Sequence, residues 1–412
     1  PLTGWGYYRV GEDGRLYLAA KSEHYHAPLG HGFPGYRLLE HARRLGISNA
    51  THNNTRGHVT RRLETELLAC ANAPDPEGRR GSLDRVLNLQ TGSLAVEAGL
   101  KMMLARFYRP EASGGSAPAA GGVPVVGVLG DADGGPTANY HGTTLLTQVL
   151  RGMWPELAAG LSDAGLLRVA AVRPNAVEDL EALFRRHAVG RERLAGFFHE
   201  LVLMNYGGLR LAEGFVRRLY ALCEQHGVPT LCDEIQSCVW APELFLYRDY
   251  GVQPTFVAAG KGLPGGEYAA SRLLLRSSED VLPQFGALVT NGQEELSALA
   301  YLVTMRWAQE NAAATRAVGR YYRERLEALA AAHPRHIDAV EGCGHMGALW
   351  FRDVETAQAF AKTVADGGVD ISVQSYKPAC PPAALTKLPL IADRAVVDFV
   401  RERFAAALER IG

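Results

Sequence analysis

The chain of 412 residues carries 43 Lys and Arg against 44 Asp and Glu, which gives a formal net charge of −1. This balance argues against a nucleic-acid-binding protein driven by phosphate contacts, because such a protein needs an excess of positive charge. Hydrophobic residues make up 47% and charged residues 21%, as in soluble globular proteins. A disordered, collagen-like or small disulfide-rich chain is therefore excluded.

No segment predicts a membrane span or a signal peptide. Apolar stretches such as 157–172 are interrupted by charges, here Asp163 and Arg168, well short of about 20 uninterrupted apolar residues. The first residues lack the basic and apolar regions of a signal peptide. The six cysteines form no C-x-x-C pair and no regular framework, so we expect a reducing, cytoplasmic location and no membrane partner.

Strands alternating with helices dominate the middle of the chain. A low-complexity stretch at 112–122 is predicted to be a mobile surface loop. After it, short apolar runs typical of buried strands lie at 123–129, 167–172, 196–204, 228–232 and 255–259. Helical patterns lie at 94–108, 176–187 and 211–226. This alternation predicts βαβ units, a mostly parallel sheet and an α/β fold.

The pattern changes after residue 291. Helices are expected at 291–311, 313–332, 355–366 and 393–411, with short strands at 336–340, 347–351 and 369–373. This arrangement predicts a smaller α+β domain. We expect residues 1–50 to be its N-terminal segment, residues 313–412 its C-terminal part, and residues 51–312 the large domain.

Two polar groups at neighbouring strand ends point to chemistry. The buried-looking strand 228–232 ends in Asp233, Glu234, Ile235 and Gln236, and the strand 255–259 is followed by Lys261 and a glycine-rich turn. Ligands of parallel sheets sit at this edge. Alone, Lys261 could be a solvated lysine, and Asp233 a helix cap or a surface ion pair. Together they can face one ligand, the acid holding a pyridinium nitrogen and the buried amine attacking an aldehyde carbon.

At this point the chain resembles the class III aminotransferases, which use pyridoxal 5'-phosphate (PLP) and have fold type I. The Asp-Glu-Ile-Gln run and the lysine-glycine turn match that family. The resemblance extends in order along the chain to further segments: Gly30–Pro34, the phosphate-cup segment Gln90–Glu97, Tyr140-His141-Gly142 and Thr290-Asn291-Gly292.

The resemblance implies a role for each matching residue. Lys261 would form the Schiff base with the cofactor and shuttle the proton, and Asp233 would pair with the pyridinium nitrogen. Gln236 would hydrogen-bond the 3′-oxygen of the ring, and Ile235 would pack opposite Tyr140. The remaining cofactor contacts would come from Thr91, Gly92, Ser93, His141 and Glu200, and from Thr290 of a neighbouring subunit. A homodimer is therefore expected.

Two departures from the family concern the substrate. The segment Glu200–Gly208 keeps the glutamate and the glycines but lacks the proline, the glutamine and a second acid. Near the C-terminus, Lys387 stands where members that bind an α-carboxylate often carry an arginine. A lysine binds carboxylate only as a point charge, so Lys387 is either a weak carboxylate ligand or, as the simpler interpretation, a surface lysine.

Two other features carry weaker predictions. His24, His26 and His31, with His52 and His58 downstream, suggest a metal cluster, but no acidic or cysteine partner recurs at ligand spacing, so we expect no metal. Arg56 lies in an early polar segment and is either a substrate-pocket residue or a solvated arginine.

The resulting hypothesis is a homodimeric PLP-dependent aminotransferase that moves an amino group from an amine or amino acid donor to an oxo acid. Two alternatives remain open. The same cofactor residues also serve aminomutases, racemases and decarboxylases. A catalytically silent homologue could act as a binding subunit, although the intact Asp233 and Lys261 argue against it.

Overall fold

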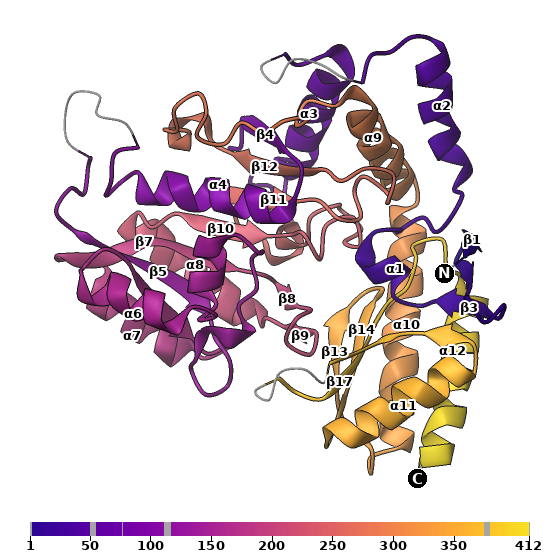
Figure 1. The fold of residues 1–412 in the computed structure, drawn as a ribbon. Coiled ribbons are helices and arrows are strands. Elements are labelled where there is room, and N and C mark those ends of the chain that lie inside the picture. The colour runs from indigo at the N-terminus through magenta and orange to yellow at the C-terminus, as the bar shows by residue number, and fades with distance from the viewer. Residues whose placement is uncertain (1, 50–54, 76, 111–116, 375–379, 412) are drawn as a thin grey trace.

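The computed structural model describes residues 2–49, 55–75, 77–110, 117–374 and 380–411. Its largest sheet has seven strands in the order β4-β12-β11-β10-β7-β5-β6 (Figure 1). The strands are β4 (Arg85–Leu89), β5 (Val123–Leu129), β6 (Arg168–Val172), β7 (Glu192–His199), β10 (Thr230–Asp233), β11 (Phe256–Ala259) and β12 (Ser271–Leu275). All are parallel except β12, which runs antiparallel to both of its neighbours. The predicted mostly parallel sheet is confirmed.

Helices cover both faces of this sheet, which explains why its central strands are continuous apolar runs. On β5, Val126 and Val128 belong to the same hydrophobic cluster as α4 (Gly92–Leu104). Their neighbours Val125 and Leu129 pack with α7 (Val177–His187) and α8 (Glu213–His226). Alternate residues of one strand thus serve opposite layers, as the two-residue repeat of a strand requires.

A second group of elements is built from both ends of the sequence. One of its sheets has the order β13-β14-β17-β16, and the other the order β1-β2-β3-β15. These strands are β1 (Thr3–Trp5), β2 (Tyr8–Val10), β3 (Leu16–Ala19), β13 (Ile337–Cys343), β14 (Met346–Phe351), β15 (Val369–Asp370), β16 (Ser372–Gln374) and β17 (Ala383–Lys387). Because β3 pairs with β15, the N-terminal and C-terminal segments share one sheet.

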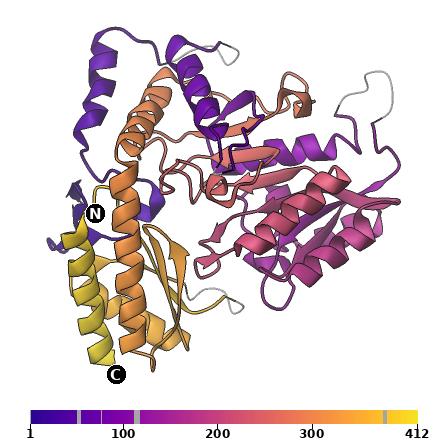
Figure 2. The same cartoon turned by 180° about the vertical axis from the view of Figure 1, so that it is seen from behind.

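Three long helices accompany these strands: α10 (Ala312–Ala332), α11 (Val354–Asp366) and α12 (Arg394–Ile411). Figure 2 shows α10 and α12 side by side, and their apolar faces share one hydrophobic cluster with β3 and β14. The predicted α+β appendage is thus present. The boundaries at residues 50 and 312 stay predictions.

The remaining elements are shorter or connect these layers. The helices are α1 (Ser22–Tyr25), α2 (Arg37–Arg44), α3 (His58–Ala71), α5 (Leu145–Leu150), α6 (Pro155–Asp163) and α9 (Glu295–Glu310). Single 3₁₀ turns occupy Pro34–Tyr36, Pro136–Ala138, Leu246–Tyr250 and Ser277–Glu279, and β8 (Val202–Leu203) pairs with β9 (Leu209–Arg210). None of the described helices is long and apolar enough to cross a membrane.

Several expectations from the sequence differ from the structure in detail. The predicted strand 196–204 is divided between β7 and β8, and the strand 369–373 is divided between β15 and β16, which belong to different sheets. Among the elements that the sequence patterns did not predict are β4, β12, β17 and α3. Residues 112–116 of the predicted loop and His52 lie outside the described residues.

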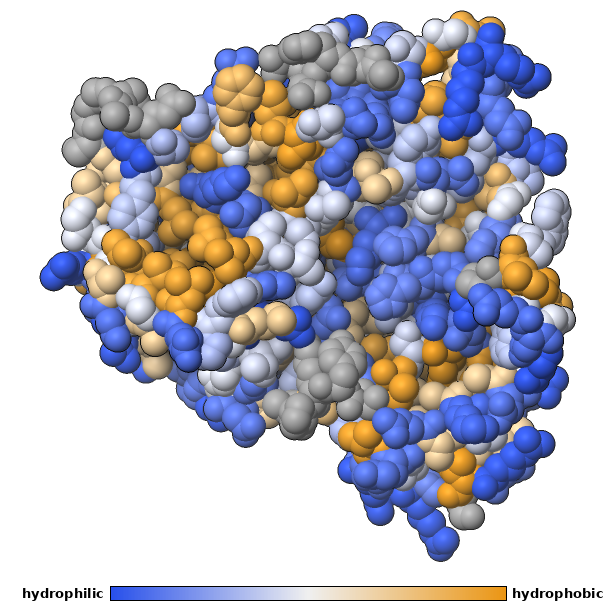
Figure 3. Space-filling view, in the orientation of Figure 1, coloured by the Kyte–Doolittle hydropathy of each residue, from blue (hydrophilic) through white to orange (hydrophobic). Residues whose placement is uncertain are grey.

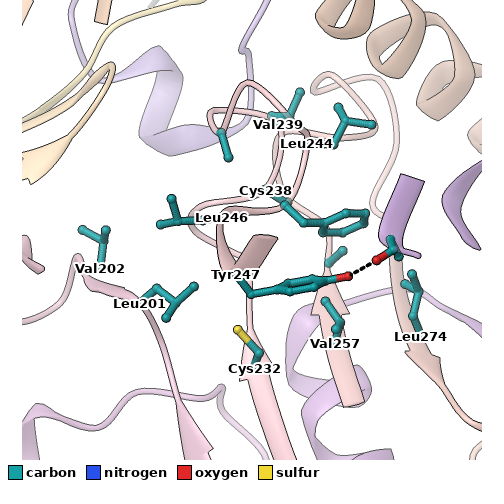
Figure 4. Close-up of a cluster of buried hydrophobic side chains, with 14 of the residues drawn as sticks. Leu201, Val202, Cys232, Cys238, Val239, Leu244, Leu246, Tyr247, Val257 and Leu274 are labelled. Atoms are coloured by element: carbon teal, nitrogen blue, oxygen red, sulfur yellow. Dashed lines mark hydrogen bonds between the residues drawn. The ribbon is translucent and has the colours of Figure 1, made fainter. Parts of the chain in front are cut away.

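The core behind the ends of β10 and β11 contains aliphatic side chains, a thiol and a phenol packed together. Figure 4 shows Cys232 of β10 and Val257 of β11 facing the ring of Tyr247. The hydroxyl of Tyr247 donates to the backbone carbonyl of Ala71 at 2.8 Å, so the buried phenol is satisfied. This packing lies directly behind the ends of β10 and β11, where the polar residues begin.

Candidate active site

Three strands deliver charged side chains to one edge of the large sheet. Asp233 closes β10, Lys261 follows the end of β11, and Glu200 comes directly after β7. All three border a cavity of about 370 Å³. The cavity is also lined by His26, Gln90, Thr91, Gly92, Ser93, Tyr140, His141, Gly142, Thr143, Ile235, Gln236, Pro264, Tyr268, Ala269, Ala270 and Ser271.

Lys261 has an unusual backbone and a buried amine. Its φ of 42° lies in the left-handed region, which residues with a Cβ rarely adopt. Residues with such strained backbone are often found at functional sites. Burial lowers the pKa of the Lys261 amine below its ordinary value, although the carboxylates of Glu200 and Asp233 oppose the shift. A larger fraction of neutral amine makes the lysine a better nucleophile.

Asp233 is held by two hydrogen bonds. Its side chain is 5% exposed, its Oδ2 accepts from Nδ1 of His141 at 2.9 Å, and its Oδ1 accepts from the backbone N–H of Ile235 at 3.1 Å. His141 is itself buried and packs against the ring of Phe198. These two hydrogen bonds therefore fix the orientation of the carboxylate, which borders the cavity.

The N-terminus of α4 forms a cradle suited to an anion. Thr91 caps this 13-residue helix, its Oγ1 accepting from the N–H of Leu94, and Ser93 Oγ accepts from the N–H of Thr143 at 3.0 Å. A Cβ on Gly92 would lie 2.9 Å from Ile235, and one on Gly142 would lie 2.6 Å from Ser93 Oγ. Both glycines thus let the backbone pack closely against Ile235 and Ser93 without blocking the cavity. The N-terminus of α4 therefore has the geometry in which helix termini bind phosphate.

Two further side chains mark the middle of the cavity. Gln236 is buried, and its Oε1 has no hydrogen-bond partner within the described chain, which leaves a polar atom for a ligand. Tyr140 lines the wall, with the guanidinium of Arg151 at 4.8 Å from its ring centroid. A flat ring could therefore lie between Tyr140 and Ile235, but that placement stays a prediction.

Three predicted residues do not line this cavity. Thr290 and Arg56 are exposed, and Arg56 pairs with Glu64 at 3.2 Å. Lys387 is fully buried, so its interpretation as a surface lysine was wrong. Its amine lies behind the cavity wall and donates to the backbone carbonyl of Gln236.

Sequence reasoning missed one wall of the cavity. Tyr268, Ala269, Ala270 and Ser271 line it, and Ser271 opens the antiparallel strand β12. The apolar run of β12 directly after the glycine-rich turn was the available signal. An antiparallel strand breaks the βαβ rhythm, so the pattern did not predict it. No three His, Cys, Asp or Glu residues come together as metal ligands in the described part of the chain.

The model of the "Aminotransferase class-III" family matches residues 3–381. The chain belongs to the class III aminotransferase family. This aminotransferase is 25% identical to the ornithine aminotransferase of Emericella nidulans, in an alignment that covers 84% of the chain and 71% of the relative. It is 27% identical to the 4-aminobutyrate aminotransferase of Escherichia coli over 55% of the chain and 56% of that relative, and 30% identical to the 5-aminovalerate aminotransferase of Pseudomonas putida over 32% and 33%.

Solved structures agree with this aminotransferase in fold. The ornithine aminotransferase of Toxoplasma gondii has a TM-score of 0.78 at 18% identity, covering 99% of this chain and 90% of that one. A PMP-bound aminotransferase of Vibrio fluvialis has the same TM-score and identity, covering 99% and 92%. The predicted family, fold type I architecture, PLP-dependent transaminase class and cofactor are thereby confirmed.

The residues present fit PLP. The start of α4 offers backbone donors and hydroxyls for a phosphate, and Asp233 offers a fixed carboxylate for a ring nitrogen. Gln236 offers a side-chain amide whose Oε1 has no partner within the described chain. Lys261 supplies the amine at the same cavity. The donor set of the cavity therefore matches the cofactor's phosphate, ring and aldehyde together.

Proposed function

We propose that this chain transfers the amino group of a primary amine or amino acid to an oxo acid, with Lys261 as the nucleophile and proton carrier. The observation that carries the proposal is one cavity bordered by the buried Lys261 amine, the Asp233–His141 pair and the N-terminus of α4. Family membership supports the reaction class.

When bound, PLP supplies an electron sink for the pair of electrons released at the donor's carbon. Asp233 would keep the ring nitrogen protonated, and His141 would hold Asp233 in the correct orientation. Thr91, Gly92 and Ser93 would bind the phosphate, and Gln236 would bind the ring oxygen. Tyr140 and Ile235 would fix the plane of the ring. Glu200, buried at the same edge, would contribute negative charge near the Lys261 amine.

Lys261 would move a proton between the donor's carbon and the cofactor. This role needs an amine that is neutral for part of the cycle, and burial lowers its pKa in that direction. The cavity walls also reduce the water around the amine, which strengthens the action of neighbouring charges. Lys261 thus has the position and the electrostatics for both steps.

The relatives suggest which donors to test first. Ornithine, 4-aminobutyrate and 5-aminovalerate, named for three of them, each carry a primary amine at the end of a short carbon chain. We propose this class of amine as donor and a small oxo acid as acceptor. Arg56 and Lys387, the two substrate ligands suggested by the sequence, both lie outside the cavity of a single chain.

We further propose a cytoplasmic homodimer in which Thr290 reaches the cofactor phosphate of the partner subunit. Thr290 is exposed, and nearby Val281 and Phe285 are 52% and 78% exposed. Figure 3 shows hydrophobic residues gathered at the left of the visible face, the side on which α4 and α6 lie in Figure 1. Exposed apolar surface of this kind supports a protein interface. Six free cysteines among the described residues fit a reducing compartment.

The decisive experiment identifies the lysine that bonds to the cofactor. The purified protein would be loaded with PLP, reduced with borohydride, digested and analysed by mass spectrometry. We expect the pyridoxyl group on Lys261 and an absorbance band at about 410–430 nm before reduction. Modification of Lys387, or of no lysine, would overturn the assignment.

Activity of the same preparation decides the reaction type. Each donor would be offered with 2-oxoglutarate or pyruvate. An aminotransferase releases the carbonyl product and aminates an equal amount of acceptor. An isomerised or decarboxylated product formed without acceptor would instead show a mutase or decarboxylase.

A further inference from the structure

Lys387 is enclosed at the end of β17, where none of its surface is exposed. Its Nζ lies 4.0 Å from the ring centroid of Trp240 and 4.4 Å from that of Tyr25, and it donates to the backbone carbonyl of Gln236. An ammonium group has three N–H donors. One carbonyl and two ring faces provide three acceptors for them.

The backbone of Lys387 also holds a strained segment. Its N–H donates to Ala20 at 2.7 Å, and its carbonyl accepts from Ser22 Oγ at 2.5 Å. The four residues of the segment Ser22–Tyr25 have φ values of 47°, 51°, 59° and 76°. A left-handed turn of four residues with side chains is unfavourable on its own, so it persists because its surroundings hold it.

These contacts reach the cavity from two directions. Gln236 lines the cavity and carries the partnerless Oε1, and its backbone is bonded by the Lys387 amine. Tyr25 lies near both lysines, because the Nζ of Lys261 is 5.5 Å from the same ring centroid. The amines of Lys387 and Lys261 therefore both lie beside one ring.

We propose that Lys387 is a positioning residue, not a ligand of the substrate carboxylate. Resting on the proposed function, this assignment has two parts. The ammonium fixes Gln236 and Tyr25 against the cavity, and its positive charge favours the neutral form of the Lys261 amine. Lys387 thereby ties the C-terminal strand β17 and the N-terminal turn to the cofactor residues after β10.

The geometry disfavours a carboxylate ligand. Lys387 is absent from the cavity lining, and its donors are already directed at protein groups. A substrate carboxylate would have to displace them in a site closed to water. Arginine would fit poorly here, because its planar fork of five donors would leave several unsatisfied.

The second part of the proposal concerns the charges of the two lysines. Burial first, and then the charge of Lys261, lower the pKa of Lys387. Two like charges repel, so a protonated Lys387 also disfavours protonation of Lys261, in addition to the burial that is the main cause of the lowered pKa of Lys261. The titratable groups that face Lys261 are Glu200, Asp233 and Cys238 from the large sheet, His24 and His26 from the N-terminal turn, and Lys387.

The test uses Lys387→Met, which keeps the length and apolar stem but removes the charge and the donors. Lys362→Met, at an exposed lysine of α11, is the matched control. Binding of PLP to the apoprotein would be measured by fluorescence titration, and the rate of Schiff-base formation would be followed by absorbance across pH. We expect Lys387→Met to weaken PLP binding about tenfold and to shift the rate profile toward higher pH, with Lys362→Met unchanged.

Lys387→Arg gives a further comparison. Because arginine keeps the positive charge but not the three compact donors, the pH profile should stay close to that of wild type while PLP binding remains weakened. If Lys387→Met does not fold, Trp240→Leu removes the nearer ring face and leaves the lysine in place. It should weaken PLP binding in the same direction.

A Lys387→Met protein with wild-type PLP binding and pH profile would overturn the proposal. A raised KM for a carboxylate-bearing donor in that otherwise unchanged protein would make Lys387 a substrate ligand. Failure of wild-type protein to bind PLP would instead refute the proposed function itself, so the two failures are distinguishable.

Discussion

Two acids and two lysines lie close to the ends of β10 and β11, and they differ in their access to the cavity. Asp233 and Lys261 border the cavity. Glu234 and Lys387 are buried in the protein, where Glu234 accepts from Ser237 Oγ and from the N–H of Tyr247, and Lys387 donates to Gln236. Each set has one acid and one lysine, and Asp233 is nearly as buried as Glu234, although Lys261 is only partly buried where Lys387 is fully buried. The two sets differ in whether their side chains can still form hydrogen bonds with a ligand in the cavity. This capacity therefore identifies the candidate site better than the burial of the charged side chains does.

Lys261→Ala gives the largest expected effect on this comparison. Loss of the amine removes both the nucleophile and the proton carrier, so kcat should fall by at least about a thousandfold. Steady-state turnover of the best donor measures the change, with Lys362→Ala as the control. Turnover within about tenfold of wild type would mean that the cavity lysine is not the reactive one.

Asp233→Asn should have the next largest effect. The amide keeps the shape but loses the negative charge, so kcat should fall by about a hundredfold or more while the melting temperature changes little. Turnover and thermal unfolding would be measured on one preparation. A large loss of stability with normal turnover would mean that Asp233, like Glu234, has a structural role and not a catalytic one.

Glu234→Gln should show the opposite behaviour, with normal turnover and a changed dependence of stability on pH. Burial raises the pKa of Glu234 from 4.5 to about 7. The stability that this raised pKa contributes is fully present below about pH 4.5 and is lost as pH rises through about 7.

Glu234→Gln removes this titration. The variant should therefore lack the part of the wild-type decline that occurs between these pH values, on the order of 1–3 kcal/mol. Denaturant unfolding of both proteins at pH 5 and pH 8 measures it. Parallel losses of stability in wild type and variant would show that another group causes the decline.

Thr290→Val should have the smallest effect. If Thr290 bonds the cofactor phosphate of the partner subunit, its loss should weaken PLP binding by about fivefold, as expected for one hydrogen bond. Titration of the apoprotein with PLP measures this, and sedimentation velocity tests whether a dimer is present. An unchanged affinity in a stable dimer would remove Thr290 from the cofactor site.

The sequence predicted the cavity pair better than the buried pair. Asp233 and Lys261 follow apolar strands directly, so local pattern and the geometry of parallel sheets place them at one edge. The position of Lys387 depends on the pairing of β17 with β14 and β16, and on Trp240 and Tyr25, which are distant in sequence. No local pattern records such contacts. The antiparallel β12, and with it the wall around Ser271, was missed for the same reason.

The clamp between Ala20, Ser22 and Lys387 has a consequence for biosynthesis. Ala20 and Ser22 lie far from Lys387 in sequence. The bonds of the Lys387 backbone to the Ala20 carbonyl and to Ser22 Oγ secure the turn that carries Tyr25. A ribosome makes the N-terminal turn before the strands of the large sheet, and β17 after them. The growing polypeptide can therefore build the sheet edge with Asp233 and Lys261 early, but this wall of the cavity is secured only after β17 has left the ribosome.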